Sequence, residues 1–221
     1  MRIRIALLLG TFVPVALPAQ GRTDYFNVET PQVKPIAVAS LGGHDYILAC
    51  NTPDNSLEVY HDTAPYPLVA RINVGLSPVT VRYNPANQRA YTCNYLGDSV
   101  SVIRFGPVAI TPGGGTATVA TFLERTSYVG DEPTDIVFSA TNLQASVTLH
   151  SRSGVALLNT ADLSVITPLA LLTGPSPVLG ADWGVKAPRR YEVLADGRAY
   201  VLNTMGGEIR RNSIYDVGLY V

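Results

Sequence analysis

A repeated block, with copies 43 to 55 residues apart, constrains the fold of this chain more than any other feature. The first copy runs from Pro35 to Tyr60 and the second from Pro78 to Ile103, so the two leading prolines lie 43 residues apart. A Cys-Asn pair follows each proline at the same offset, beginning at Cys50 and at Cys93. A repeat of this length predicts stacked or radial β units that bury their apolar faces against one another.

Each copy predicts strands joined by tight turns. After the Cys-Asn pair, the segments 51–56 and 94–99 are rich in Asn, Asp and Gly, which tolerate the left-handed conformations of such turns. The alternating segment 99–102 that follows is typical of a strand with one packed face. A third copy begins at Pro133 and a fourth near Pro188.

The size of the unit predicts the architecture. A fourth strand is expected in the connecting segment 68–74, which gives about four strands in roughly 40–55 residues, as in a propeller blade. The sequence therefore predicts an all-β fold, a β-propeller of about four blades of antiparallel strands. The repeats lie near 33–74, 75–120, 130–172 and 185–221.

Two segments need a choice between structures. The apolar segment 156–172 is predicted as strand, because polar residues and Pro168 interrupt any helical pattern. The segment 107–117, which contains three consecutive glycines from Gly113, is predicted as a long loop.

The first 19 residues resemble an export signal. Arg2 and Arg4 precede a short apolar run, residues 5–15, and Ala19 offers a small residue for cleavage. The alternative is a membrane anchor, but the run is shorter than the roughly 20 residues that span a bilayer. We expect a signal peptide over 1–19 and a single domain over 20–221, located in the periplasm, at the cell surface or outside the cell.

Composition narrows the class of partner. Charged residues make up 15% of the chain and hydrophobic residues 47%, which argues against disorder. Without residues 1–19, the chain keeps 14 basic and 17 acidic residues, a net charge of −3. Since no basic stripe remains, nucleic-acid binding is not expected. Prolines, glycines and charged residues interrupt every later apolar run, so no membrane span is expected in the mature chain.

The two cysteines are expected to be free. Their equal positions in adjacent repeats usually place them further apart than the ~4.4–6.8 Å between Cα atoms that a disulfide needs. A disulfide is the alternative, because an exported chain with two cysteines permits one.

No motif in the chain predicts a catalytic, cofactor or metal site. The three histidines, His44, His61 and His150, show no ligand spacing, and neither cysteine belongs to a Cys-x-x-Cys pair. The densest acidic cluster is formed by Asp131, Glu132 and Asp135; a solvated loop explains it better than calcium binding or acid–base chemistry. Trp183, with Tyr191 and Tyr200 nearby in sequence, is assigned to core packing, with a binding surface as the alternative.

Three segments resemble a known repeat. They are Leu48–Asn51, Tyr91–Asn94 and Tyr200–Asn203, each followed by a turn and a strand, and they are similar to the YVTN β-propeller repeat. The resemblance covers about residues 33–210 and implies a propeller of exported or surface-layer type, related to lactonase-like and cytochrome d1-like propellers. The third copy departs from the motif, with Leu149 in place of Asn.

The expected function is an exported, non-catalytic binding or interaction module without a cofactor. Its partner, a protein or a small molecule, would bind at one propeller face.

We expect an incomplete ring, completed by further blades or by a partner chain; a closed ring of four blades is the alternative. The alternative functions are a lactonase-like or redox enzyme with a site at the channel mouth, and the propeller portion of a larger enzyme. Three or more His, Asp, Glu or Arg side chains that converge at the channel would favour the enzyme.

Overall fold

The computed structural model describes residues 32–110, 117–151, 154–170, 188–193, 199–203 and 209–212. These residues contain fifteen β-strands and no helix, so none of them belongs to a helix that could cross a membrane. The predicted signal peptide, the Gly113 loop and Trp183 lie outside the described residues.

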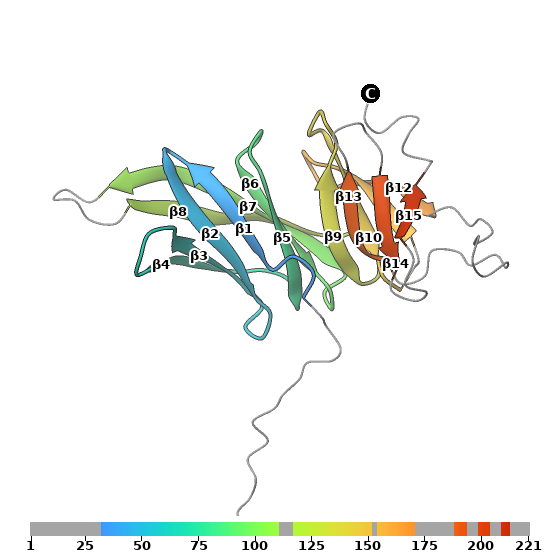
Figure 1. Ribbon diagram of the computed structural model, residues 1–221, viewed down its shortest axis with the longest axis horizontal. Coiled ribbons are helices and arrows are strands. Elements are labelled where there is room, and N and C mark those ends of the chain that lie inside the picture. Colours follow the sequence, from blue (N-terminus) through green and yellow to red (C-terminus); the bar gives the residue numbers. More distant parts are fainter. Residues whose placement is uncertain are drawn as a thin grey trace, which may run out of the picture.

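The strands form four antiparallel sheets, called blades 1 to 4, in which each strand pairs with its neighbour in the sequence (Figure 1). Blade 1 contains β1 (Ile36–Leu41), β2 (His44–Asn51), β3 (Ser56–His61) and β4 (Leu68–Asn73). Blade 2 contains β5 (Pro78–Asn84), β6 (Arg89–Asn94), β7 (Ser99–Ile110) and β8 (Ala117–Tyr128). Blade 3 contains β9 (Pro133–Phe138), β10 (Gln144–Leu149), β11 (Gly154–Asn159) and β12 (Val165–Ala170). Blade 4 contains β13 (Pro188–Val193), β14 (Ala199–Asn203) and β15 (Ile209–Asn212).

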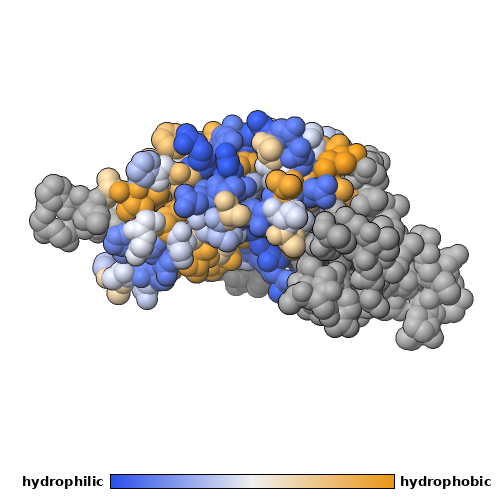
Figure 2. Space-filling view, turned by 90° about the horizontal axis from the view of Figure 1, so that it is seen from above, coloured by the Kyte–Doolittle hydropathy of each residue, from blue (hydrophilic) through white to orange (hydrophobic). Residues whose placement is uncertain are grey.

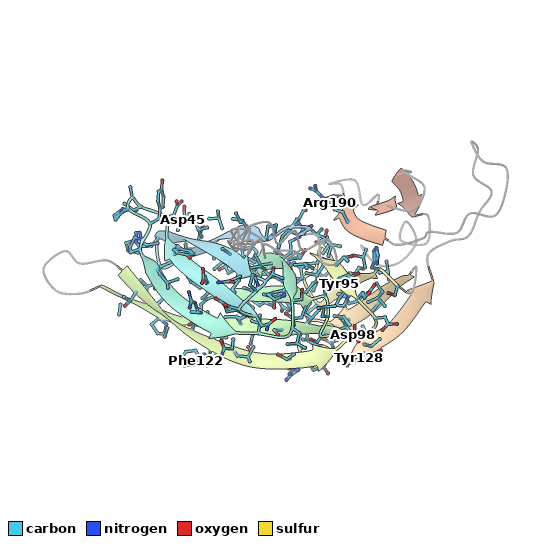
Figure 3. All side chains as sticks on the ribbon, turned by 90° about the horizontal axis from the view of Figure 1, so that it is seen from below. Asp45, Tyr95, Asp98, Phe122, Tyr128 and Arg190 are labelled. Atoms are coloured by element: carbon cyan, nitrogen blue, oxygen red, sulfur yellow. The ribbon has the colours of Figure 1, made fainter. Side chains whose placement is uncertain are left out.

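The blades follow one another along an arc. The first strands of successive blades are neighbours, since β1 lies against β5, β5 against β9, and β9 against β13. Figure 3 shows the arc from below, with β8 along its convex side, where Phe122 and Tyr128 are labelled. The four sheets of the described residues do not close into a ring. The predicted all-β fold with blades of antiparallel strands is therefore confirmed.

Blades 1 and 2 share one hydrophobic core. Alternate residues of β1 and β2, such as Leu41 and Leu48, point towards Val81, Ile103 and the rest of the facing side of blade 2. All of these side chains are buried. The period-2 alternation of each strand supplies one apolar face, and the next blade covers it.

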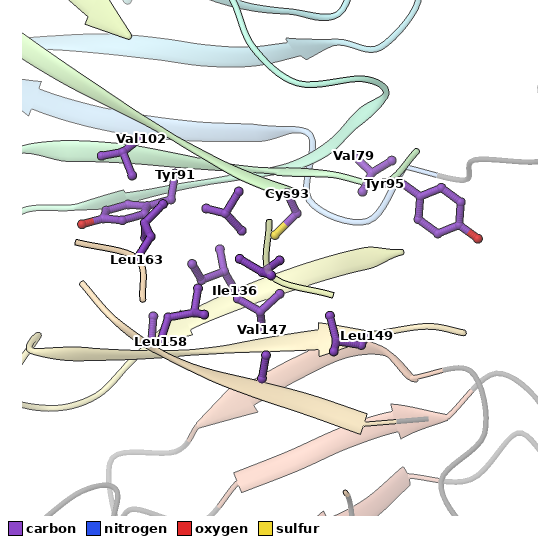
Figure 4. Close-up of a cluster of buried hydrophobic side chains, with 14 residues drawn as sticks. Val79, Tyr91, Cys93, Tyr95, Val102, Ile136, Val147, Leu149, Leu158 and Leu163 are labelled. Atoms are coloured by element: carbon purple, nitrogen blue, oxygen red, sulfur yellow. The ribbon is translucent and has the colours of Figure 1, made fainter. Parts of the chain in front are cut away.

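A second core lies between blades 2 and 3 (Figure 4). Cys93 and Tyr91 of β6 face Ile136 and Val147 of blade 3 across it. The Tyr91 ring meets the Phe138 ring edge-on, with centroids 4.9 Å apart. Blade 2 is consequently covered on both faces.

The two cysteines are free thiols at equivalent strand positions, as predicted. Cys50 pairs with Leu57 across its hairpin, and Cys93 pairs with Val100. Burial raises the pKa of the Cys50 thiol to about 12. Burial, together with the nearby Asp135 charge, raises the pKa of Cys93 well above its usual value. Cys93 packs in the core between blades 2 and 3, and Cys50 packs against the core between blades 1 and 2.

The turns before β3 and β7 have the predicted geometry. Asn55 and Asp98 lie in the left-handed region, with φ of 53° and 49°. These residue types lose less energy there than most others. Within the segment 156–172, residues 156–159 and 165–170 belong to β11 and β12 as predicted, but residues 160–164 form a turn between the two strands.

The predicted loop over 107–117 was wrong at both of its ends. Strand β7 continues through Pro107 to Ile110, and β8 begins at Ala117. The register shifts between Phe105 and Val108, so Gly106 and Pro107 occupy a β-bulge. A bulge tolerates a proline that cannot donate to the strand ladder, and the hairpin therefore extends past the point where the proline predicts an end.

Candidate functional site

Five charged side chains meet near the inner strands of the arc, and we call them the axial charge cluster: Lys34, Arg82, Asp135, Arg190 and Glu192. They come from the segment before β1 and from β5, β9 and β13, so all four blades supply or adjoin a member. Arg190 is labelled in Figure 3, on the side of the arc opposite Phe122 and Tyr128. Three cations and two carboxylates leave the cluster with one net positive charge.

The centre of the cluster is a two-pronged ion pair between blades 2 and 3. Arg82 Nε donates to Asp135 Oδ1 at 3.2 Å, and Nη2 donates to Oδ2 at 3.1 Å. The Asp135 side chain is fully buried and the Arg82 side chain is 24% exposed. The backbone N–H of Ile136 also donates to Oδ1, at 2.9 Å. This pairing compensates for the buried carboxylate.

The three cations of the cluster all lie near one carboxylate oxygen of Glu192, Oε1. Lys34 Nζ donates to its Oε1, Arg190 Nη2 lies 2.8 Å from the same oxygen, and Arg82 Nη2 lies 3.8 Å from it. Burial raises the pKa of Glu192, but the hydrogen bonds from Lys34 and Arg190 and the nearby charges outweigh burial and lower it overall. Glu192 is therefore held as the anion.

Threonine hydroxyls fix the backbone beneath the cluster. The Lys34 N–H donates to Thr80 Oγ1 at 3.2 Å, and Thr80 Oγ1 donates to the Thr134 carbonyl at 2.7 Å. The Asp135 N–H in turn donates to Thr148 Oγ1 at 3.0 Å. These bonds run from the segment before β1 through blade 2 to blade 3, and so hold the charged residues at a fixed spacing.

The chemistry of the cluster is that of charge recognition. Its cations are partly exposed, with Lys34 19% and Arg190 49% accessible. A guanidinium and an ammonium around one partly exposed carboxylate oxygen offer several donors to an anion that displaces it. The two carboxylates are poor general bases, because each is tied to an arginine.

The acidic cluster predicted at 131–135 is divided by the structure. Asp135 turns into the sheet and joins the axial charge cluster. Glu132 instead lies in the loop between blades 2 and 3, with a φ of 52°. The three carboxylates thus form no single site, and Asp135 has a role different from the predicted solvated loop.

Glu132 forms a small network of its own. Its Oε2 lies 3.0 Å from His150 Nδ1 and accepts a hydrogen bond from Ser151, while Tyr95 OH lies 3.4 Å from the same His150 nitrogen. Burial raises the pKa of Glu132, but the bonds from Ser151 and His150 outweigh it and lower the pKa overall. Because Ser151 donates to the carboxylate and not to the imidazole, the network is not a nucleophile paired with its base.

The other two histidines lie next to each other in blade 1, where His44 begins β2 and His61 ends β3. The His44 and His61 rings lie with centroids 5.8 Å apart, on adjacent strands. Across the described ranges, no group of three or more His, Cys, Asp or Glu residues is placed to hold a metal ion. The side chains of Tyr191 and Tyr200, and the whole of Trp183, are outside the described residues.

Sequence reasoning missed the axial charge cluster. Lys34 and Glu192 are 158 positions apart, and nothing in their local sequence marks them as partners. One signal was present: Arg82, Asp135 and Glu192 each fall on the first strand of a repeat. In a propeller, those strands lie side by side around the axis.

Comparison with other proteins supports the fold. The sequence matches no protein-family model and no curated protein. Solved structures match over most of the chain. One is a periplasmic gluconolactonase, PpgL, from Pseudomonas aeruginosa, with 15% identity, a TM-score of 0.57, and coverage of 81% of this chain and 49% of that one.

Two further structures have other roles. The Cps50 (Swd1) β-propeller domain of Myceliophteria thermophila is 12% identical, with a TM-score of 0.56 and coverage of 79% and 51%. Hydrazine synthase of Kuenenia stuttgartiensis is 17% identical, with a TM-score of 0.51 and coverage of 87% and 52%. This chain therefore spans about half the length of each. Proteins so different in activity share only the fold, and the fold of this chain is that of a β-propeller arc.

Proposed function

We propose that this chain is an exported propeller module of the YVTN-repeat type that binds a small organic anion at the axial charge cluster. The observation that carries the proposal is the convergence of Lys34, Arg82 and Arg190, from three separate elements, on one carboxylate oxygen of Glu192. A carboxylate of a ligand can take the place of Glu192 without leaving a cation unpaired. Small-molecule sites commonly form where several structural elements meet, and this cluster lies where residues of several blades meet.

Binding of gluconate, measured by calorimetry, tests this function. We expect saturable binding, and we expect Arg190→Met to weaken it at least about tenfold, a loss of about 1.4 kcal/mol. Arg104→Met is the matched control, because Arg104 lies over the Phe122 ring, 4.9 Å from its centroid, away from the cluster. Absence of binding up to about 10 mM gluconate, citrate and phosphate would reject the proposal, as would equal effects of the two variants.

A second candidate function is lactone hydrolysis. Four side chains of the expected kinds converge: Arg82, Asp135, Arg190 and Glu192. Three or more converging His, Asp, Glu or Arg side chains were expected to favour an enzyme. The fold likeness to a gluconolactonase points the same way. Against it, both carboxylates are ion-paired, and Glu192 has a lowered pKa. Hydrolysis of glucono-δ-lactone above the buffer rate, followed by base consumption at constant pH, would favour this enzyme over the binding module.

The export part of the proposal rests on residues 1–19. The mass of the protein recovered from the producing cell tests it. We expect a mature chain that begins at Gln20, in the periplasmic, surface or extracellular fraction; an intact Met1 in the cytoplasmic fraction would overturn the proposal.

A further inference from the structure

The two histidines of blade 1 belong to a cluster that has no part in the proposed anion site. An aspartate follows each of them, since the dipeptide His-Asp begins at His44 and again at His61. The pairing of β2 with β3 sets the two dipeptides side by side, and the Asp62 N–H donates to the Asp45 carbonyl at 3.1 Å. We call these four residues the His-Asp tip of blade 1. Figure 3 labels Asp45 at one end of the arc, away from Arg190 of the axial charge cluster.

The two imidazoles of the tip lie at a spacing that suits one shared ion. His61 is opposite Tyr46 in the strand register, and His44 lies two residues before Tyr46, on the same face of β2. The two imidazole centroids are 5.8 Å apart, with an interplanar angle of 53°. An ion bound to one nitrogen of each ring at about 2.0–2.1 Å, in a tetrahedral site, would hold the centroids roughly 5 Å apart. A small rotation of either ring about its broad χ2 torsion closes the difference.

The two rings are half-buried and held in place by their surroundings. The fully buried Tyr46 ring meets the His61 ring edge-on, with centroids 5.6 Å apart. His44 directly follows the tight turn at 42–43, where φ is 57° and 81°. None of the described residues forms a hydrogen bond to either imidazole, so their nitrogens can bind an ion. Because both histidines are on paired strands, they lose little freedom when they do so.

The charge of blade 1 favours a cation at the tip. Residues 35–70 contain no lysine or arginine and four carboxylates: Asp45, Asp54, Glu58 and Asp62. The two aspartates of the tip are exposed, and their negative potential raises the local concentration of cations. Hydrophilic and hydrophobic residues are interspersed over the face of the molecule in Figure 2, so hydropathy does not distinguish the tip, whereas its charge and its imidazoles do.

We propose that the His-Asp tip binds one divalent transition-metal ion through the imidazoles of His44 and His61, with water in the remaining coordination positions. Imidazole is a ligand of Zn²⁺, Ni²⁺ and Cu²⁺, and Cu²⁺ binds such sites most tightly. The aspartates supply charge and not ligands, because Asp45 directly follows His44 and points to the other face of β2. A site with two protein ligands agrees with the finding that, among the described residues, no three such side chains are placed to hold a metal ion.

Calorimetric titration of the full chain with Cu²⁺, in a buffer without chelating groups, tests the proposal. We expect one ion per chain with a dissociation constant below about 100 μM, which rises at least about tenfold in His44→Gln and in His61→Gln. His150→Gln is the matched control, because His150 lies beside Glu132 and Tyr95, outside the tip. Absence of binding up to about 1 mM Cu²⁺, or equal weakening by all three variants, overturns the proposal. Far-UV circular dichroism of each variant checks that the β-sheet fold is intact.

Electron paramagnetic resonance of the Cu²⁺ complex distinguishes a shared site from an ion on a single histidine. We expect hyperfine splitting from two imidazole nitrogens in the unmodified chain and from one in His61→Gln. A spectrum of the unmodified chain with splitting from a single nitrogen, or from none, would overturn the proposal even if the ion binds. Neither result bears on gluconate binding, because the axial charge cluster contains no residue of the tip.

Discussion

Blades 1 and 2 are built from the same repeat, yet they differ in how many of their faces are covered. Both have four strands in the same order and in equivalent register. Blade 2 packs on both sides, whereas blade 1 packs on one and leaves Ile36 and Val38 exposed. The same alternation of residues therefore forms a buried, stabilising face where a neighbouring blade packs on it, and a solvent-exposed face where none does.

The motif asparagines show the difference most clearly. Asn94 of blade 2 is fully buried; its Nδ2 donates to Ser99 Oγ at 3.1 Å and to Ser101 Oγ at 2.9 Å. The connection from blade 1 crosses directly over it, at Gly75, where a Cβ atom would lie 2.5 Å from the Asn94 amide nitrogen. That close approach requires glycine.

In blade 1 the equivalent asparagine bonds to two carboxylates, the exposed Asp54 and the buried Glu58. Asn51 Nδ2 donates to Asp54 and Glu58, both at 3.0 Å. Glu58 occupies the position of Ser101, and Arg71 that of Thr126. The covered blade thus has two small hydroxyl side chains, 2.8 Å apart, where the uncovered blade has an ion pair.

The largest expected effect concerns matched isoleucines on equivalent faces. Ile103→Ala should lower the free energy of unfolding by about 2–5 kcal/mol, because it leaves a cavity between blades 1 and 2. Ile36→Ala should change it by no more than about 0.5 kcal/mol, since the side chain is already exposed. Urea denaturation of the two variants measures both losses. Equal losses would contradict the difference in burial between Ile36 and Ile103.

An intermediate effect is expected from the asparagines. Asn94→Ala should cost about 1–3 kcal/mol, because it removes the donor to the buried Ser99 hydroxyl and the acceptor of the buried Thr92 hydroxyl. Asn51→Ala should cost less than about 1 kcal/mol, because Asp54 is exposed to water and Glu58 keeps its hydrogen bonds from Tyr60 and Arg71. The same denaturation experiment compares them. A larger loss for Asn51 would show that blade 1 is covered in the folded monomer.

The smallest effect is the pH dependence of stability that Glu58 contributes in blade 1. Hydrogen bonds from Tyr60 and Asn51 lower the pKa of Glu58 and outweigh burial, with a further contribution from Arg71. Because the folded pKa lies below the unfolded value, the stabilisation is present above pH ~4.3 and is lost as pH falls through the folded pKa. Glu58→Gln should therefore differ from wild type by up to about 1 kcal/mol at pH 6, and the difference should shrink by pH 3.

The control for this prediction is the equivalent position in blade 2. Ser101→Ala removes a hydroxyl that does not titrate, so its effect should be the same at pH 6 and at pH 3. Thermal or urea unfolding at the two pH values measures both variants. A Glu58→Gln difference that grows as the pH falls would contradict a folded pKa of Glu58 below its unfolded value.

Local sequence was enough to predict the strands, the turns and the blade as a unit. Alternation of apolar and polar residues over a few positions specifies a half-buried strand, and Asn55 and Asp98 specify the turns between strands. The equal offsets of Cys50 and Cys93 correctly predicted equivalent positions for free thiols. The same local rules failed at Pro107, where pairing with β8 carries the strand through a bulge.

The packing of blades along the arc determined the rest. Arg82 and Asp135 are 53 positions apart, and Lys34 and Glu192 are 158 positions apart, so no local pattern could indicate that they pair. Alternation also gives each strand two faces without saying which neighbour covers them, and this is why Ile36 and Ile103 could not be told apart in advance. Burial and charge pairing depend on long-range contacts, which exist only once successive blades have packed against one another.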